Sequence, residues 1–113
     1  MSLKLHTITK ERNFKEIAKK GRAVRNGEIT LKILKNENEY NSFGIVISTK
    51  VSKLATKRNQ LKRRIKEIIR DDLKNQKIGY KVMILISPKV LEKEYSEIKE
   101  SILGLFNKAG LYD

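Results

Sequence analysis

Seven basic side chains lie within residues 56–70, whose sequence is TKRNQLKRRIKEIIR. Arg presents a planar fork of hydrogen-bond donors and Lys a compact positive charge, so a cluster of this kind suits the binding of phosphate groups. The same segment contains Leu61, Ile65 and Ile69, and their spacing is typical of a helix with one apolar stripe. The segment therefore predicts a helix that is anchored in a core and presents positive charge to a polyanion.

The position of two charges around this helix predicts a groove. At about 100° per residue, Arg58 and Lys62 fall within the angular range of the apolar stripe, one turn before the stripe becomes fully aliphatic. We expect the first turn to extend past the core, so that these charges line a groove along the edge of a sheet. Two alternatives are weaker: solubility is normally achieved with mixed charges, and a membrane-surface helix normally carries Trp or Phe, which this helix lacks.

The overall charge favours a nucleic acid as the partner. The chain has 113 residues, with 26 Lys and Arg against 13 Asp and Glu, a net charge of +13. Residues 1–25 and 50–77 hold the whole excess. A small body with this charge also attracts anionic membranes and acidic proteins, but nucleic acid is the commonest partner of such a domain.

The composition also limits the class of protein and its location. There is no Cys and one histidine, His6, which excludes a disulfide scaffold, a zinc ribbon and a Cys nucleophile. The N-terminal sequence lacks the apolar core of a signal peptide, and no run reaches membrane-spanning length. We therefore predict a cytoplasmic protein with no membrane partner. Because no linker interrupts the chain, residues 1–113 are predicted to form a single domain.

The periodicity of apolar residues predicts an α+β fold, a two-layer α-β-β-α-β-α sandwich with a small mixed sheet. A first helix is expected with Thr9 as its N-cap residue and Gly21 at its end. A central strand covered on both faces is expected at 43–49, because its residues are almost continuously apolar. The other elements are expected at 28–34 and 80–87 for strands, and at 57–73 and 93–108 for helices.

No autonomous enzyme can be assembled from these residues. The chain offers no nucleophile with a neighbouring base and no metal cluster, so we assign no catalytic residue and no metal ligand. We interpret Glu67, Asp71 and Asp72 as ion-pair partners of Arg63 and Arg70 at helical spacing. A ribosomal or other structural RNA-binding protein, with no associated reaction, remains an alternative that composition cannot separate.

Four segments resemble one known family over nearly the whole chain. RNQLKRRIKE at 58–67 follows GIVISTK at 44–50, RNFKEIAKKGRAV lies at 12–24, and the chain ends in LFNKAGLY at 105–112. Together they resemble the bacterial ribonuclease P protein component. The short Arg-Asn-x-x-Lys-Arg string is weak alone, but it is fairly specific after a Gly-containing strand and a Lys-rich loop.

This resemblance implies a function and a fold. In that family the protein binds a large catalytic RNA, with one protein expected per RNA, and the complex removes the 5′ leader from precursor tRNA. The RNA and its Mg²⁺ ions are the catalyst, so the chain alone is expected to be inactive and to bind no cofactor through its side chains. The implied fold resembles domain 2 of ribosomal protein S5, with a left-handed βαβ crossover that departs from the usual right-handed rule.

The resemblance also assigns site residues by position. Phe14, Lys32 and Ser48 fall in the leader cleft. The helical spacing of Phe14 with Ile17 by itself favours a core residue, and only the resemblance favours the cleft. Gln60 replaces the usual Arg, and Ala18 and Lys32 stand where relatives can have aromatic residues, so we expect little base stacking. The implied RNA-binding residues are Lys50, Lys53, Lys57, Arg58, Asn59, Lys62, Arg63, Lys66 and Arg70.

Overall fold

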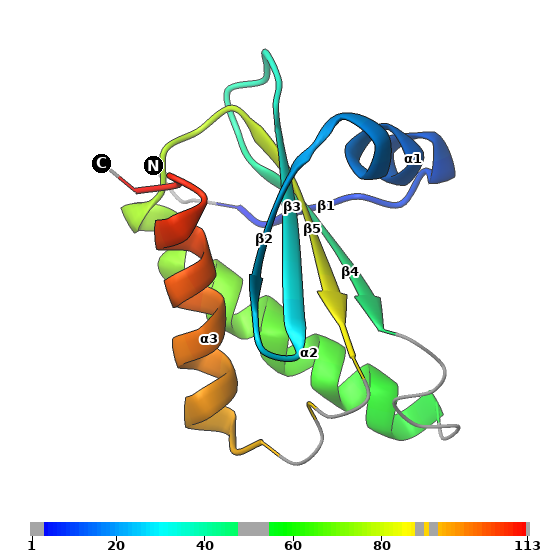
Figure 1. Ribbon diagram of the computed structural model, residues 1–113, viewed down its shortest axis with the longest axis vertical. Coiled ribbons are helices and arrows are strands. Elements are labelled where there is room, and N and C mark those ends of the chain that lie inside the picture. The colour runs from blue at the N-terminus through cyan, green and yellow to red at the C-terminus, as the bar shows by residue number, and fades with distance from the viewer. Residues whose placement is uncertain (1–3, 48–54, 88–89, 91–92, 113) are drawn as a thin grey trace.

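The protein folds around one five-stranded mixed sheet. The computed structural model describes residues 4–47, 55–87, 90 and 93–112, and Figure 1 shows the arrangement of the elements. The strand order is β1-β4-β5-β3-β2, with β1, β4 and β5 parallel and with β3 antiparallel to both β5 and β2. The strands are β1 (His6–Thr7), β2 (Arg22–Asn26), β3 (Ile29–Lys35), β4 (Ser42–Ile47) and β5 (Tyr80–Ile86).

Three helices flank the sheet, close to their predicted positions. Helix α1 spans Glu11–Lys20, α2 spans Ala55–Asp72 and continues into the short 3₁₀ helix η1 at Leu73–Asn75, and α3 spans Tyr95–Lys108. Helix α1 begins one residue later than predicted: Lys10 instead of Thr9 is its N-cap residue, and the Lys10 side chain makes no capping hydrogen bond. The predicted α+β class is confirmed.

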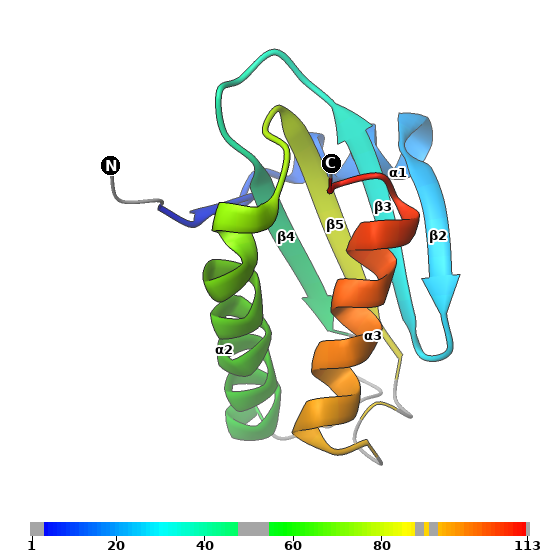
Figure 2. The ribbon, with the colours of Figure 1, turned by 90° about the vertical axis from the view of Figure 1, so that its left-hand side faces the viewer.

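The helices lie on both faces of the sheet. Figure 2 shows α2 and α3 side by side on one face, where they complete the predicted two-layer sandwich. Figure 2 also shows α2, which connects the parallel strands β4 and β5 along the chain, in front of the sheet. The β4-α2-β5 connection is a left-handed crossover. Helix α1 packs on the opposite face, where Ile17 is buried together with Met83 and Ile8. In this third, partial layer α1 packs over β3 and β5, and the Phe14 ring reaches Gly44 of β4.

The prediction that residues 43–49 form a central strand covered on both faces is wrong. Strand β5 takes the central place, between β4 and β3, and β4 has only the two-residue β1 on its other side. Val46 is 37% exposed. The apolar run has a different cause: Phe43 packs into the core beneath α2 and α3, with Ile45 and Ile47 partly buried against it.

Two strands were absent from the prediction because their sequences carry little period-2 signal. Strand β1 has only two residues, and β2 has the sequence RAVRN, in which only Val24 is partly buried. Tertiary pairing creates both. Strand β2 forms a hairpin with β3 through a two-residue turn at Gly27 and Glu28, and Gly27 has the positive φ of 59° that such a turn requires.

The apolar stripe of α2 anchors the helix as predicted. Ile65 and Ile69 are completely buried, and Ile68 and Leu61 are nearly so. They join one core cluster with the inner residues of β3, β4 and β5 and with Ile102, Leu105 and Phe106 of α3. Burying a side chain of this size contributes about 1.5–3 kcal/mol, so the stripe fixes the position of the basic face of α2.

The end of α2 is held by the buried carboxylate of Asp72. The prediction that Asp72 forms an ion pair with an Arg of the same helix is therefore wrong. Asp72 is buried and accepts hydrogen bonds from Asn75 (3.1 Å), Gln76 (3.0 Å) and the Tyr112 hydroxyl (2.6 Å). Within the described residues, none of the ion pairs involves Asp72, Asp71 or Glu67. Asp72 therefore ties the C-terminal segment to α2, because the fold brings Tyr112 closer to it than any Arg.

Substitution of Tyr112 by Phe should measure this contact. Burial, followed by the hydrogen bond to Asp72 and its negative charge, raises the pKa of the Tyr112 hydroxyl above its ordinary value. The hydroxyl therefore stays a donor at neutral pH. Tyr112→Phe should lower the free energy of unfolding by about 1–3 kcal/mol, because it removes one donor from a buried carboxylate. Urea unfolding followed by circular dichroism would measure this loss, and unchanged stability would contradict it.

Candidate nucleic-acid interface

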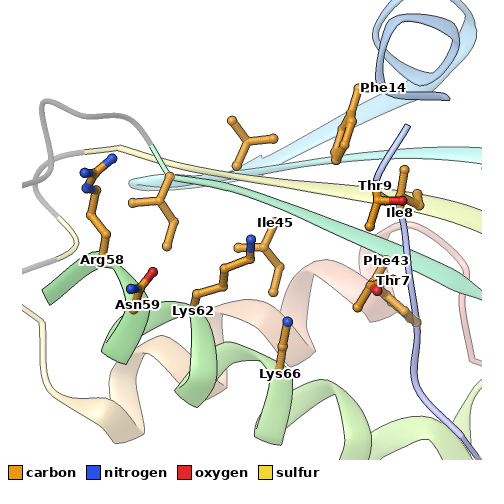
Figure 3. A pocket seen from close by; sticks show the side chains of 12 residues that line it. Thr7, Ile8, Thr9, Phe14, Phe43, Ile45, Arg58, Asn59, Lys62 and Lys66 are labelled. Carbon is orange, nitrogen blue, oxygen red and sulfur yellow. The ribbon is translucent and has the colours of Figure 1, made fainter. Parts of the chain in front are cut away.

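A groove of about 590 Å³ runs along the edge of the sheet between α2 and the N-terminal segment. Figure 3 shows its side chains. One wall is formed by α2, the floor by β4, and the other wall by Phe14 of α1 with the segment that begins at β1. The lining residues are Thr7, Ile8, Thr9, Phe14, Phe43, Ile45, Val46, Ile47, Arg58, Asn59, Lys62 and Lys66.

The wall on α2 is cationic. Arg58, Lys62 and Lys66 are spaced four residues apart and therefore lie on one face of the helix, and in Figure 3 the ammonium groups of Lys62 and Lys66 extend toward β4. No ion pair among the described residues involves any of the three. The prediction that the early charges of this helix line a groove at the sheet edge is confirmed.

Arg58 carries an unsatisfied donor in the groove. Its Nε atom is buried and has no hydrogen-bond partner among the residues that the structure describes. A buried donor without a partner costs about 1–3 kcal/mol. An unsatisfied buried donor of this kind is not explained by stability, so it is consistent with a functional role for Arg58.

The open edge of β4 adds backbone groups to the groove. Strand β1 pairs with β4 only at Ser42 and Phe43, and Ile8 donates its backbone N–H to the Phe43 carbonyl at 2.9 Å. Because backbone groups alternate in direction along a strand, those of Ile45 and Ile47 point to the same side as the Phe43 carbonyl. In the described part of the chain no strand pairs with them there.

Phe14 is both a packing residue and a part of the groove. It packs against Ile8, Ile17 and Met83, and it also lines the groove. Its ring lies directly over Gly44, since a Cβ atom at that position would collide with the ring. Phe14 can therefore be a core residue and a groove residue at the same time. Gly44 is the residue that lets the Phe14 ring approach the strand.

A second basic surface lies on the other side of α2. Lys57 lines a smaller cavity of about 260 Å³ together with Gln60, Arg64 and Lys93. Arg63 and Arg70 are exposed on α2 and line neither cavity. The seven predicted RNA-binding residues that the structure describes thus lie on different sides of α2, and Arg58, Asn59, Lys62 and Lys66 are those that share the groove.

Lys32, another predicted cleft residue, does not meet Phe14 in this groove. Lys32 lies on β3, and its ammonium group donates to the carbonyl of Ala18 in α1 at 3.1 Å. It supports the helix that carries Phe14 and does not line the groove. Ser48, Lys50 and Lys53 lie outside the described residues.

Thr7, Ile8 and Thr9 are lining residues that the sequence did not reveal. The segment is too short for a periodic signal, and only its pairing with β4 brings it to the groove. Helix α1 is held above it by Lys81, which donates to Asn13 at 3.3 Å and forms an ion pair with Glu16 at 3.8 Å. The wall opposite α2 is therefore a product of tertiary contacts.

The described lining of the groove combines cationic and apolar side chains. It contains no acid, histidine or cysteine, and the described residues include no group of three or more His, Cys, Asp or Glu that could hold a metal ion. None of the described helices is both long enough and apolar enough to cross a membrane. A cationic wall above an apolar floor fits a single-stranded nucleic acid, which presents phosphates on one side and bases on the other. Fold and groove thus define a small basic α+β protein of the nucleic-acid-binding class.

Comparison with known proteins gives the family. The family model Ribonuclease P matches residues 3–110. The chain is 34% identical over 112 residues to the ribonuclease P protein component of Clostridium botulinum (strain Loch Maree / Type A3), covering 98% of this chain and 100% of that protein. It is 36% identical over 111 residues to that of Clostridium acetobutylicum, covering 96% and 92%.

Solved structures agree with these matches. The RNase P protein from Thermotoga maritima superposes with a TM-score of 0.83 at 27% identity, covering 91% of this chain and 96% of that one. The Staphylococcus aureus RNase P protein, at 23% identity, shares the fold with a TM-score of 0.88 and coverage of 97% and 100%. The chain belongs to the ribonuclease P protein family.

Proposed function

We propose that this chain is the protein subunit of a ribonuclease P ribonucleoprotein, in which it binds the catalytic RNA and the 5′ leader of precursor tRNA. The complex hydrolyses one phosphodiester bond and so produces the mature 5′ end of the tRNA. The RNA and its Mg²⁺ ions perform the chemistry. One protein subunit serves one RNA, and the protein supplies affinity and positions the substrate.

The groove between α2 and Phe14 is the observation that carries this proposal. Arg58, Lys62 and Lys66 face a strip of apolar surface on β4, with Phe14 opposite. Phosphates of an extended strand would lie against the cations, and unpaired bases would lie over the apolar floor and the Phe14 ring. Duplex RNA exposes no bases for such contacts, so the groove favours the single-stranded leader over the folded part of the tRNA.

A structural RNA-binding protein without an associated reaction is the second candidate. The charge of the chain fits it equally well. Membership of the ribonuclease P protein family favours the first candidate. The two also differ in a measurable way, because only the first requires the protein to discriminate a leader-bearing tRNA from a mature one.

Lys62→Ala should weaken this discrimination. With a bacterial ribonuclease P RNA present, the unmodified protein should bind precursor tRNA more tightly than mature tRNA. Loss of one phosphate contact should reduce that preference about 5- to 10-fold, on the order of 1 kcal/mol. Fluorescence anisotropy of labelled tRNAs with and without a leader would measure it. Arg63→Ala is the matched control, because it removes the same charge from a part of α2 outside the groove, and an equal loss in both variants would contradict the assignment.

Binding to RNA should also weaken steeply with salt. Each Lys or Arg that contacts a phosphate releases condensed counterions, so about five contacts should give a slope of about −3.5 to −4.5 for log K against log salt concentration. A titration of monovalent salt at constant magnesium would measure this slope. A flat response would rule out phosphate contacts by the basic face of α2.

A further inference from the structure

An aromatic pair lies immediately beyond one end of the groove. The rings of His6 and Tyr40 are stacked, with centroids 3.9 Å apart and an interplanar angle of 24°. His6 directly precedes Thr7, and Tyr40 lies three residues before Phe43; both Thr7 and Phe43 line the groove. Figure 3 shows these two residues at the end of the groove opposite Arg58. A strand bound along α2 would therefore reach the aromatic pair as it leaves the groove.

The pair is held in place by the backbone on either side. His6 belongs to β1 and pairs with Ser42. Asn41, which follows Tyr40, is buried; its side chain accepts a hydrogen bond from the Tyr80 N–H (2.9 Å) and donates to the Lys77 carbonyl (2.6 Å). Tyr40 nevertheless remains 41% exposed. A rigid and accessible aromatic surface loses little conformational entropy when a ligand stacks on it.

The surrounding charges indicate which part of a nucleotide would bind. Glu37 and Glu39, in the loop that carries Tyr40, are both exposed. Their carboxylates would repel a phosphate, so the loop does not continue the cationic wall formed by α2. A nucleobase carries no such charge and stacks on an aromatic ring whatever its identity. The ligand that fits is therefore an unpaired base.

We propose that the His6–Tyr40 pair is a stacking platform for one unpaired base of the leader, at the end of the groove away from Arg58. The inference rests on the proposed function of the groove and adds a contact at its exit. Such a platform makes leader length matter, since a leader too short to reach Tyr40 gains nothing from it. It contributes affinity without base specificity.

A leader-length series tests the platform in the reconstituted holoenzyme. Equilibrium binding of precursor tRNAs with successively longer leaders should show a gain in affinity once the leader reaches the pair. Tyr40→Ala should lose about 5- to 150-fold in affinity for those longer leaders and nothing for shorter ones. Tyr40→Phe should retain the gain. Tyr95→Ala is the matched control, because Tyr95 is similarly exposed, at 39%, and lies on α3 outside the groove.

Two further readouts separate stacking from a merely structural role. Tyr40→Ala should leave the salt dependence of binding unchanged, whereas loss of a phosphate contact in Lys62→Ala should reduce the slope by about 1. A single abasic nucleotide, moved along the leader, should weaken binding to the unmodified protein at the position that reaches Tyr40, beyond the positions that lie over the Phe14 ring. At that position it should cause no additional loss in Tyr40→Ala, as expected of two changes that remove one interaction.

The outcomes distinguish the platform from the groove. A flat abasic scan with the unmodified protein would overturn the platform even if Tyr40→Ala failed to fold. Equal losses for short and long leaders in Tyr40→Ala would also overturn it, because they would indicate a structural effect. If Lys62→Ala reduces the preference for precursor tRNA while the scan is flat, the groove assignment stands and the platform fails. If the scan shows a position whose sensitivity disappears in Tyr40→Ala and Lys62→Ala has no effect, the platform stands and the assignment of the phosphates to the α2 wall of the groove fails.

Discussion

Purified free of RNA, this protein should cleave no precursor tRNA at any magnesium concentration. Among the described residues, the groove lining consists of cations, threonines, one asparagine, aliphatic side chains and the rings of Phe14 and Phe43, and it includes no Asp, Glu, His or Cys that could act as a general acid or base. With a bacterial ribonuclease P RNA added, cleavage at the mature 5′ end should appear and should require less magnesium than the RNA alone. Cationic side chains near the leader reduce the phosphate repulsion that high magnesium otherwise screens.

A gel assay with 5′-labelled precursor tRNA would test this division between protein and RNA. Protein treated with nuclease and repurified, RNA alone, and the two together should be compared over a magnesium titration. Cleavage at the mature 5′ end by RNA-free protein would contradict the proposal. A contaminating ribonuclease would cut at other positions as well, so the site of cleavage is the control.

Ile65→Ala should lower the free energy of unfolding by about 2–5 kcal/mol. Ile65 is completely buried between α2 and the sheet, so its truncation removes apolar contacts and leaves a cavity. This is a large share of the stability of a small domain, which is about 5–15 kcal/mol. Urea unfolding monitored by circular dichroism would measure the change, and a loss below 1 kcal/mol would contradict the packing of α2 as described.

Two variants of the basic face provide the controls for Ile65→Ala. Arg63 is exposed, and Arg63→Ala should change the free energy of unfolding by no more than about 0.5 kcal/mol. Arg58→Ala should be equally neutral or slightly stabilising, because it removes a buried Nε donor that has no partner among the described residues. It should nevertheless weaken RNA binding. A protein that unfolds when Arg58 is removed would show that this side chain holds the fold together.

The expectation of little base stacking concerns two positions of the cleft and not the surface beyond the groove. It rested on Ala18 and Lys32, and in the structure these two residues contact each other through the Lys32 ammonium group and the Ala18 carbonyl. The additional aromatic surface lies elsewhere, at His6 and Tyr40. The sequence separates these two by more than thirty positions, and neither stands in a motif. Only the pairing of β1 with β4 brings the rings together.

The sequence by itself determined the elements whose signal is local. The apolar spacing of Leu61, Ile65 and Ile69 determined α2 and its buried stripe, and the angular position of Arg58 and Lys62 determined that charges would line a groove. Both follow from the geometry of a single helix, in which 3.6 residues complete a turn regardless of what surrounds it. The α+β class followed in the same way from elements long enough to show a period.

The tertiary structure alone decided which segments face α2 across the groove. The order of strands in a sheet depends on long-range pairing, so the apolar sequence of β4 was compatible with a central strand although β5 holds that place. Asp72 was assigned to Arg by helical spacing, yet Tyr112 reaches it from the far end of the chain. A two-residue strand such as β1 has no periodicity of its own. Its position, and with it the second wall of the groove, arises only when β4 supplies the hydrogen-bond partners that its backbone requires.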